Sequence, residues 1–427
     1  MNIKKIVAST IAISLLAGTT ALTDVNLKNN IFNTFSASAE EITGQCGENV
    51  TYTLDSNGVL TISGTGNMYD YNSSEDTPFP AMGDKINSVV IEQGVTSIGS
   101  NAFYRCKNLK SIKMADTVTF INYYAFSICE NLKDVYLSKS IKEISTGAFR
   151  YCSGLENITI PDGVEIIEGE AFRNCTSLTN VTIPNSVKKI KKLAFNACSN
   201  LKSINIPDSV VSIEENSFSN CENLTNITIP NSVKYIYSNA FYSCSSLKEI
   251  SLPDSLISIS SNAFAQCSGL TEITLPNSVE SIGNTAFSNC VNLQKIYIPK
   301  SMRSIAEDSF DFSYKLKDIY FGGTEEDWDY FSISKNKDLK VKFHFNAKGL
   351  FELGDVNRDE KIDSKDAVLI LKSYAELLAT GKMENIDTIS ADVNSDGKVD
   401  SKDAVLILKY YAAVLAGTFE GSISDLK

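Results

Sequence analysis

Two acidic segments near the C-terminus carry the residue types that bind a hard metal ion. They read DVNRDEKIDSKD and DVNSDGKVDSKD and occupy residues 355–366 and 392–403. Calcium takes six to eight oxygen ligands, and a twelve-residue loop supplies them from positions 1, 3, 5, 9 and 12 and from the backbone carbonyl of position 7. The pattern predicts two calcium ions, one in each loop. The predicted ligands are Asp355, Asn357, Asp359, Lys361, Asp363 and Asp366 in the first loop, and Asp392, Asn394, Asp396, Lys398, Asp400 and Asp403 in the second.

The elements that position these loops are short helices. Each loop runs directly into AVLILK, which makes the segment a duplication with an offset of 37 residues. Two loops that each lead into a helix, with Asp rather than Glu at position 12, resemble a type I dockerin. The resemblance spans residues 354–427 and implies a small all-α, calcium-dependent domain that binds a cohesin module of a scaffoldin. Position 6 is Gly397 in the second loop but Glu360 in the first, so the first site is expected to bind calcium more weakly.

The dockerin resemblance also implies which residues contact the cohesin, namely loop positions 10 and 11 and the helix that follows. These residues are Ser364, Lys365, Leu371 and Lys372 in the first copy, and Ser401, Lys402, Leu408 and Lys409 in the second. Since both copies read DSKDAVLILK, the domain is expected to bind in either of two orientations. The alternative for Leu371 and Leu408 is a place in the helix core.

Upstream of this module, the sequence repeats every 23 residues. Phenylalanines follow the period from Phe103 to Phe310, and cysteines follow it from Cys106 to Cys290. A fixed period of this length predicts a solenoid, because single units cannot bury their apolar face alone. Each unit carries two short apolar runs separated by a turn, as in VTIPNSVKKI (residues 181–190), so we expect a mainly β solenoid with two short strands per turn. A bend or a short helical turn would bring the phenylalanine and the cysteine inward.

The pattern LxxIxIPxSVxxIxxxAFxxC resembles the leucine-rich repeats of the BspA-like type. The resemblance covers about 230 residues and implies a right-handed, slightly curved solenoid with a binding face, but it names no ligand. The segment from Cys46 to Met82 resembles the N-terminal β cap of such arrays, with a hairpin around Asn57 and a surface loop from Asn72 to Pro80. After the last repeat, IYFGGTEEDWDYF resembles a terminal hairpin, with Trp328 in the core of a cap.

The cysteine column admits two interpretations. Nine of the ten cysteines recur with the period, so their side chains are expected to point in the same direction from neighbouring turns. Parallel Cβ vectors suit a disulfide poorly, which favours buried free thiols that act as small apolar residues. The alternative is disulfide pairing between turns. A metal ladder is disfavoured because tetrahedral sites use paired C-x-x-C or histidine ligands.

The outward positions of the first strand form the expected face of the solenoid. They are rich in hydroxyl and amide groups, and Tyr136 and Tyr297 are the aromatic residues assigned to them. This face is either a solvated surface with cross-strand hydrogen bonds or a binding surface for a protein or glycan. Because this face has few aromatic residues, a carbohydrate-binding platform is disfavoured. The other positions are Asn157, Thr159, Asn180, Thr182, Ser203, Asn205, Asn226, Thr228, Glu249, Ser251, Glu272, Thr274 and Lys295.

Composition and the N-terminus bound the function. A net charge of −12 over 427 residues disfavours nucleic acid and anionic lipid as partners. The single histidine, His344, lies in an alternating run that predicts a strand position. Lys4 and Lys5 precede an apolar run, and Ala37 and Ala39 offer a cleavage site, so a secretory signal is favoured over a membrane anchor. We expect a signal peptide (1–39), an N-terminal cap (40–87), a solenoid (88–321), a C-terminal cap and linker (322–353) and a dockerin (354–427).

These features favour a secreted, non-catalytic recognition or adhesion subunit that is anchored to a scaffoldin through its dockerin. The repeats offer no paired carboxylates for glycoside hydrolysis, no nucleophile elbow and no catalytic histidine. The alternatives are an enzyme subunit of a cellulosome and a polysaccharide-targeting subunit, either of which would serve polysaccharide catabolism. An adhesin for host or bacterial cells is a further alternative. The ligand of the solenoid and the matching cohesin are not indicated by the sequence.

Overall fold

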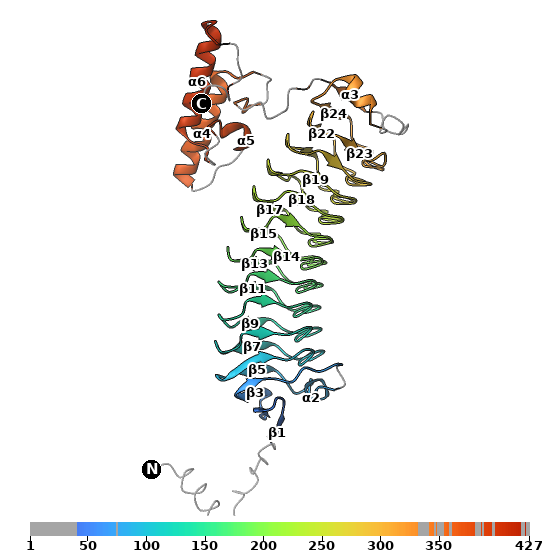
Figure 1. The fold of residues 1–427 in the computed structure, drawn as a ribbon, viewed down its shortest axis with the longest axis vertical. Helices are drawn as coiled ribbons and strands as arrows, with labels where there is room; N and C mark the ends of the chain where they lie inside the picture. Colours follow the sequence, from blue (N-terminus) through green and yellow to red (C-terminus); the bar gives the residue numbers. More distant parts are fainter. Residues whose placement is uncertain are drawn as a thin grey trace, which may run out of the picture. The chain divides into compact units, whose positions relative to one another are not determined.

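The computed structural model describes residues 41–73, 76–331, 341–345, 347, 354–357, 361–380, 386, 388–394, 398–419 and 423. The predicted signal peptide lies outside the described residues, as do the predicted ligands Asp359 and Asp396. The structure comprises a β-solenoid of about 11 turns and a small helical module (Figure 1), which confirms the expected fold class. Among the described helices, none has the length and apolar character that crossing a bilayer requires.

All turns of the solenoid but one contribute a first strand, and paired neighbours among these strands run parallel at a register of 23 residues. Alternation sets their orientation: in Ser111–Met114, Ile112 and Met114 are buried whereas Lys113 is exposed. The first strands are β5 (Ser88–Ile91), β7 (Ser111–Met114), β9 (Asp134–Tyr136), β11 (Asn157–Thr159), β13 (Asn180–Thr182), β15 (Ser203–Asn205), β17 (Asn226–Thr228), β20 (Glu272–Thr274), β22 (Lys295–Ile298) and β24 (Asp318–Phe321).

A second, shorter strand follows in each turn after a Pro-bearing or similar tight turn. From β6 onward its last residue is buried, as Ile190 and Ile282 illustrate. The second strands are β4 (Gly66–Asn67), β6 (Val95–Ile98), β8 (Phe120–Ile121), β10 (Glu143–Ile144), β12 (Ile166–Ile167), β14 (Lys189–Ile190), β16 (Ser212–Ile213), β18 (Tyr235–Ile236), β19 (Ser258–Ile259), β21 (Ser281–Ile282) and β23 (Ser304–Ile305). The prediction of two short strands per turn is therefore confirmed.

Neither ladder of strands is continuous. Hydrogen bonding joins β9 to β7 but not to β11, and it is also interrupted between β13 and β15 and between β17 and β20. The segment 249–251, where a first strand was expected, forms none. The second ladder is interrupted between β8 and β10 and between β14 and β16. The turns are held together across these interruptions by the third side of the solenoid.

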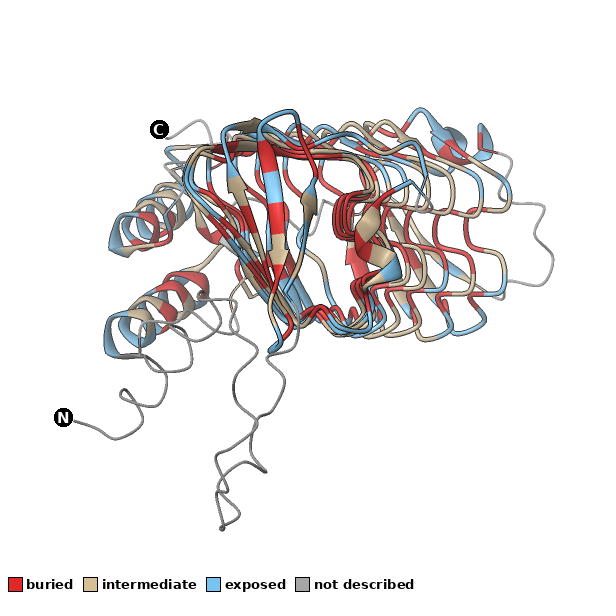
Figure 2. Cartoon of the chain, turned by 90° about the horizontal axis from the view of Figure 1, so that it is seen from below, coloured by how far each residue is buried: buried red, intermediate tan, exposed pale blue. Residues whose placement is uncertain are grey.

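That third side is a column of stacked phenylalanines. Neighbouring ring centroids from Phe79 to Phe310 lie 4.8 to 5.8 Å apart, and every ring is buried. From Phe103 to Phe287, a bend rather than a helix places each ring, since two residues with left-handed backbone flank it, such as Asn216 (φ 56°) and Asn220 (φ 60°) around Phe218. Viewed along the stack, buried residues line the inside of the turns (Figure 2).

The cysteine column lies beside the phenylalanines. All ten cysteines are free and buried, as the thiol interpretation predicts. Eight of them donate from Sγ to a phenylalanine carbonyl 26 residues earlier; for Cys198 the acceptor is Phe172, at 3.2 Å. Ser313 takes the place of cysteine in the last repeat and donates to Phe287 at 2.8 Å. The thiols therefore satisfy backbone carbonyls inside the core.

The N-terminal cap is an antiparallel meander of β1 (Ile42–Gln45), β2 (Val50–Leu54) and β3 (Val59–Gly64). The expected hairpin is present, and its turn is fixed by the Asp55 carboxylate, which accepts from the backbone of Asn57 and Val59. β3 then pairs in parallel with β5. The expectation of a loop up to Pro80 is wrong at its end, because α2 (Pro78–Ala81) buries Phe79 against Phe103 and so begins the phenylalanine column.

The C-terminal end of the solenoid also differs from the prediction. Trp328 is buried, as expected, but the described residues around it form no terminal hairpin. A capping box between Thr324 and Asp327 starts α3 (Glu325–Asp329), and β25 (Lys342–His344) then pairs with β24 in parallel rather than antiparallel. Trp328 packs against Phe321 at 5.2 Å and Phe343 at 5.1 Å.

The helical module contains α4 (Ser364–Thr380), α5 (Thr388–Ala391) and α6 (Ser401–Leu415). Its core is built from equivalent residues of the two sequence copies. Ala367 and Ile370 of α4 correspond to Ala404 and Ile407 of α6, and all four are buried. The offset of 37 residues in the sequence is therefore an internal symmetry of the packing.

Candidate metal and partner-binding sites

The two acidic loops are tied to the helices that follow them. Asp400 caps the N-terminus of α6 by accepting from Lys402 N at 2.7 Å, and Asp403 accepts from Asp400 N at 2.9 Å. Asp363 and Asp366 make the same two bonds in the first loop, at 2.7 and 2.8 Å. Loop positions 9 and 12 are thus oriented by the start of the helix, which explains why the loop and the helix are repeated as one unit.

The carboxylates at position 12 lie inside the module. Asp366 and Asp403 are fully buried, and Asp366 Oδ1 accepts from Val356 N at 2.8 Å and from Asn357 N at 2.9 Å. Burial raises the pKa of both carboxyls above the ordinary value, although these backbone donors act in the opposite direction.

A divalent cation beside these carboxylates would offset the cost of burying their charge. The described parts of the loops therefore fit calcium, the hard ion that oxygen ligands select. Over those described parts, and the rest of the described chain, no group of three or more Asp, Glu, His or Cys side chains is close enough to hold a metal. Position 5 of each loop, Asp359 or Asp396, lies outside the described residues. The ligand assignments remain predictions.

The residues predicted to contact a cohesin lie on the outside of α4 and α6. Leu371 and Leu408 are each 43% exposed, so the alternative that places them in the helix core is wrong. The charged and hydroxyl members of the set are exposed as well: Ser364, Lys365, Lys372, Ser401, Lys402 and Lys409.

The structure adds two residues that sequence reasoning missed. Val368 and Val405 occupy equivalent positions one helical turn before Leu371 and Leu408 and are 54% and 47% exposed. Their spacing of three residues from the leucines is the signal that could have found them. The module therefore presents two matching faces, each with an exposed Val–Leu pair framed by Ser and Lys.

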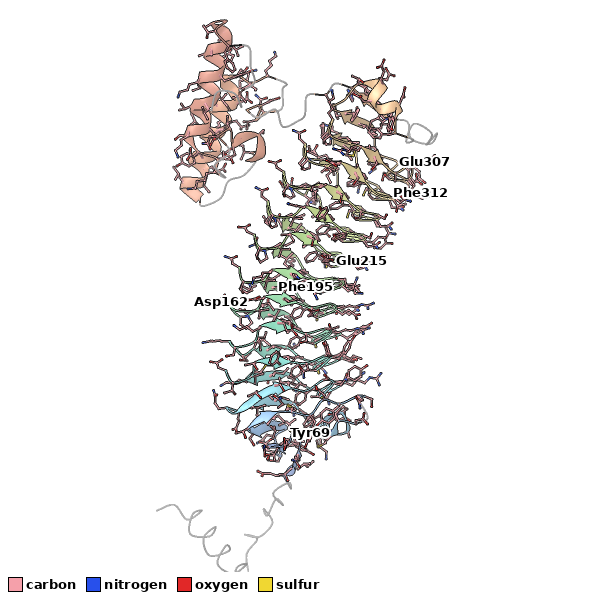
Figure 3. All side chains as sticks on the ribbon, in the orientation of Figure 1. Tyr69, Asp162, Phe195, Glu215, Glu307 and Phe312 are labelled. Carbon is pink, nitrogen blue, oxygen red and sulfur yellow. The ribbon has the colours of Figure 1, made fainter. Side chains whose placement is uncertain are left out.

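On the solenoid, the predicted outward residues do point to solvent. Asn180 donates to Asn157 at 3.0 Å, and Thr179 donates to the Glu156 carbonyl at 3.1 Å. These bonds agree with the account of a polar surface with cross-strand hydrogen bonds. Tyr136 is 64% exposed and lies in the same column as Thr159. Side chains along both edges of the stack are shown in Figure 3, where Asp162 marks the edge that follows the first strands.

An aromatic ladder crosses the C-terminal end of this face, and the sequence indicated only its first member. Tyr297 stacks on Tyr320 at 4.5 Å, and Tyr320 stacks on His344 at 4.2 Å. His344 lies in β25, as predicted, and pairs with Asp318 at 2.8 Å. Parallel rings this close cover one another's faces, so the ladder offers mainly ring edges to a ligand rather than a flat platform for sugars.

Comparison with protein families gives two matches. The family model for the BspA type leucine-rich repeat region matches residues 79–202, 144–249, 188–317 and 234–347. The model for the dockerin type I domain matches residues 353–411. Both matches confirm the resemblances seen in the sequence, and together they describe an interaction module with a domain that attaches to cohesins. No curated protein matches the chain.

Several solved structures are similar to the solenoid. A leucine-rich cell surface protein from Faecalibacterium prausnitzii is 25% identical, with 69% of this chain and 98% of that chain covered and a TM-score of 0.38. A leucine-rich repeat protein from Eubacterium ventriosum is 24% identical, with 64% and 95% covered and a TM-score of 0.35. One from Bacteroides ovatus is 24% identical, with 69% and 98% covered and a TM-score of 0.32.

Proposed function

Because the chain belongs to the BspA-type leucine-rich repeat family and carries a type I dockerin domain, we propose that it is a secreted, non-catalytic recognition subunit of a cellulosome-like complex. The dockerin attaches it to a scaffoldin cohesin in the presence of calcium. The solenoid presents a binding surface to another protein or to a cell-surface component. The domain boundaries given above belong to this proposal.

The observation that carries the proposal is the pair of equivalent faces on the helical module. Each face combines an exposed apolar pair, Val368 with Leu371 or Val405 with Leu408, with a loop whose position 12 carboxylate is buried. Calcium bound in both loops would hold the two helices in place, because it neutralises Asp366 and Asp403. An apolar patch framed by cations and hydroxyl groups suits a protein surface with apolar and acidic groups.

A pull-down tests the attachment. The full chain is passed over immobilised cohesin modules from several scaffoldins, in calcium and again after chelation with EDTA. We expect retention by a subset of cohesins in calcium and loss of retention in EDTA. Retention that is indifferent to EDTA, or no retention on any cohesin of a broad panel, would refute the proposal.

A second measurement addresses the solenoid. The residues 40–350, which lack the dockerin, are incubated with insoluble plant polysaccharides and with extracts of neighbouring cells. Specific protein partners, with no retention on polysaccharide, are the expected result. Retention on a polysaccharide would instead assign the solenoid a targeting role, which is the first alternative.

The second alternative is an enzyme subunit, since dockerins are often joined to enzymes. The outward charges of the solenoid change from turn to turn, as at Glu272, Lys295 and Asp318 in one ladder column, which suits a surface better than a conserved pair of catalytic carboxylates. An assay for sugars released from the same polysaccharides tests this alternative, and the expected result is no release above the level of the buffer control.

A further inference from the structure

The first-strand sheet is open between β9 and β11. Backbone hydrogen bonds join β7 to β9 and β11 to β13, whereas none joins β9 to β11, although both strands and their flanking turns are fully described. A hollow of about 1020 Å³ lies at this interruption. Two strand edges with unpaired backbone groups therefore face one space.

The opening is local, because the same two turns are joined on every other side. Phe126 and Phe149 stack at 5.6 Å in the core. Glu165 N donates to the Lys142 carbonyl at 2.7 Å where the second strands begin, and Lys133 pairs with Glu156 at 3.6 Å before the first strands. The result is a slot about five residues long, or roughly 16 Å at 3.3 Å per strand residue.

The floor and the rim of the slot have different chemistry. Val135 and Leu137 are only half-buried, whereas Ile112 at the equivalent position of the joined strand β7 is fully buried. The missing neighbour on the β11 side thus leaves part of the apolar floor uncovered. On the rim of the slot, the side chain of Tyr136 in β9 points outward and is 64% exposed.

We propose that this slot binds an extended peptide segment of a partner protein, which adds a strand between β9 and β11. An extended peptide backbone carries donors and acceptors along both of its edges, and a sugar chain does not. Every second side chain of the peptide would lie over Val135 and Leu137. The peptide should therefore carry aliphatic residues at these alternate positions. The inference rests on the proposed function, since it names the kind of partner that the solenoid recognises.

The charged side chains at the rim of the slot indicate which charge the peptide should carry. The Lys133–Glu156 pair neutralises itself, which leaves Asp134 and Asp162 against Lys139. The excess is negative, and Asp134 points outward on the same face as Tyr136. A basic residue between two aliphatic residues therefore fits the slot, with its stem against the Tyr136 ring.

Hydrogen exchange of the full chain tests the proposal, with acetyl-Thr-Val-Lys-Val-Thr-amide as the probe. Without the peptide, the amides of β9 and β11 should exchange faster than those of β22, which is hydrogen-bonded to a strand on each side. Saturating peptide should slow exchange in β9 and β11. The same peptide with two N-methylated residues keeps its side chains but lacks two donors, and it should protect neither strand.

Two substitutions sharpen the test. Tyr136→Ala should weaken the peptide about tenfold, whereas Thr274→Ala, at the equivalent outward position of the joined β20–β22 pair, should leave the affinity unchanged. Exchange in β9 and β11 as slow as in β22 without peptide, no protection by the peptide, or protection of the same amides by a cello-oligosaccharide would each overturn the proposal. Cohesin binding does not involve the slot, so these outcomes leave the attachment proposal to its own test.

Discussion

At the scale of single residues, the thiol column couples stability to pH. Burial raises the pKa of Cys221 to about 12, and it raises the pKa of the neighbouring column members too. In an unfolded chain a cysteine titrates near 8.5. Between these values the folded protein keeps the proton and the unfolded chain loses it, so stability is intact below about pH 8.5 and falls as pH rises towards 12.

We therefore expect alkaline conditions to unfold the solenoid. Each thiol removes ~1.4 kcal/mol of stability per pH unit above about 8.5. Urea titrations from pH 7 to 10, with a reductant present, should show a midpoint that falls steeply above pH 8.5. Cys198→Ser should make the slope shallower, because serine does not titrate there and Ser313 already makes the equivalent bond. An identical slope for this variant would contradict the explanation.

A second residue-scale prediction concerns the first calcium loop. Glu360 stands where the second loop has Gly397, at the position that makes the sharp turn of a calcium loop. A left-handed backbone there costs a non-glycine residue about 1 kcal/mol. Glu360→Gly should tighten the weaker of two calcium affinities about fivefold in a calorimetric titration, while Gly397→Glu should weaken the other. Titrations unchanged by both substitutions would rule out this asymmetry between the loops.

At the scale of strands and helices, the period of the sequence predicted the turns well, because alternation and the Phe and Cys positions are local properties of one repeat. It did not predict which neighbouring strands hydrogen-bond. The opening between β9 and β11 depends on how adjacent turns pack, which no single repeat encodes. Tyr320 and His344 were missed as partners of Tyr297 for a related reason: β25 reaches the sheet from beyond the repeats, by a parallel connection in place of the expected hairpin.

The two helices α4 and α6 carry the next prediction. Their exposed faces are equivalent, so a cohesin should accept either one. Replacing Val368 and Leu371 with Ala should reduce cohesin binding by about twofold, because the α6 face remains. Replacing Val405 and Leu408 as well should abolish binding, and calcium titration and circular dichroism should show that the module still folds. Loss of binding from one pair alone would mean that only one face is used.

At the scale of the whole molecule, the phenylalanine column makes the solenoid a linear array whose turns depend on their neighbours. Phe195, labelled in Figure 3, stacks on Phe172 at 5.3 Å and on Phe218 at 5.7 Å, whereas Phe310 is the last ring of the column. Removing a buried ring costs ~3–5 kcal/mol. Loss of the ring should therefore affect unfolding differently at Phe195, inside the column, and at Phe310, at its end.

Phe195→Ala should uncouple the two halves of the array, so that urea unfolding splits into two transitions and exchange protection falls on both sides of the substitution. Phe310→Ala removes the same ring at the end, and it should leave one main transition with loss of protection confined to the last turns. The two variants are matched in chemistry, so a difference between them reports position in the array alone. Equal, single transitions in both would show that the solenoid unfolds as one cooperative unit and that nearest-neighbour stacking does not set its stability.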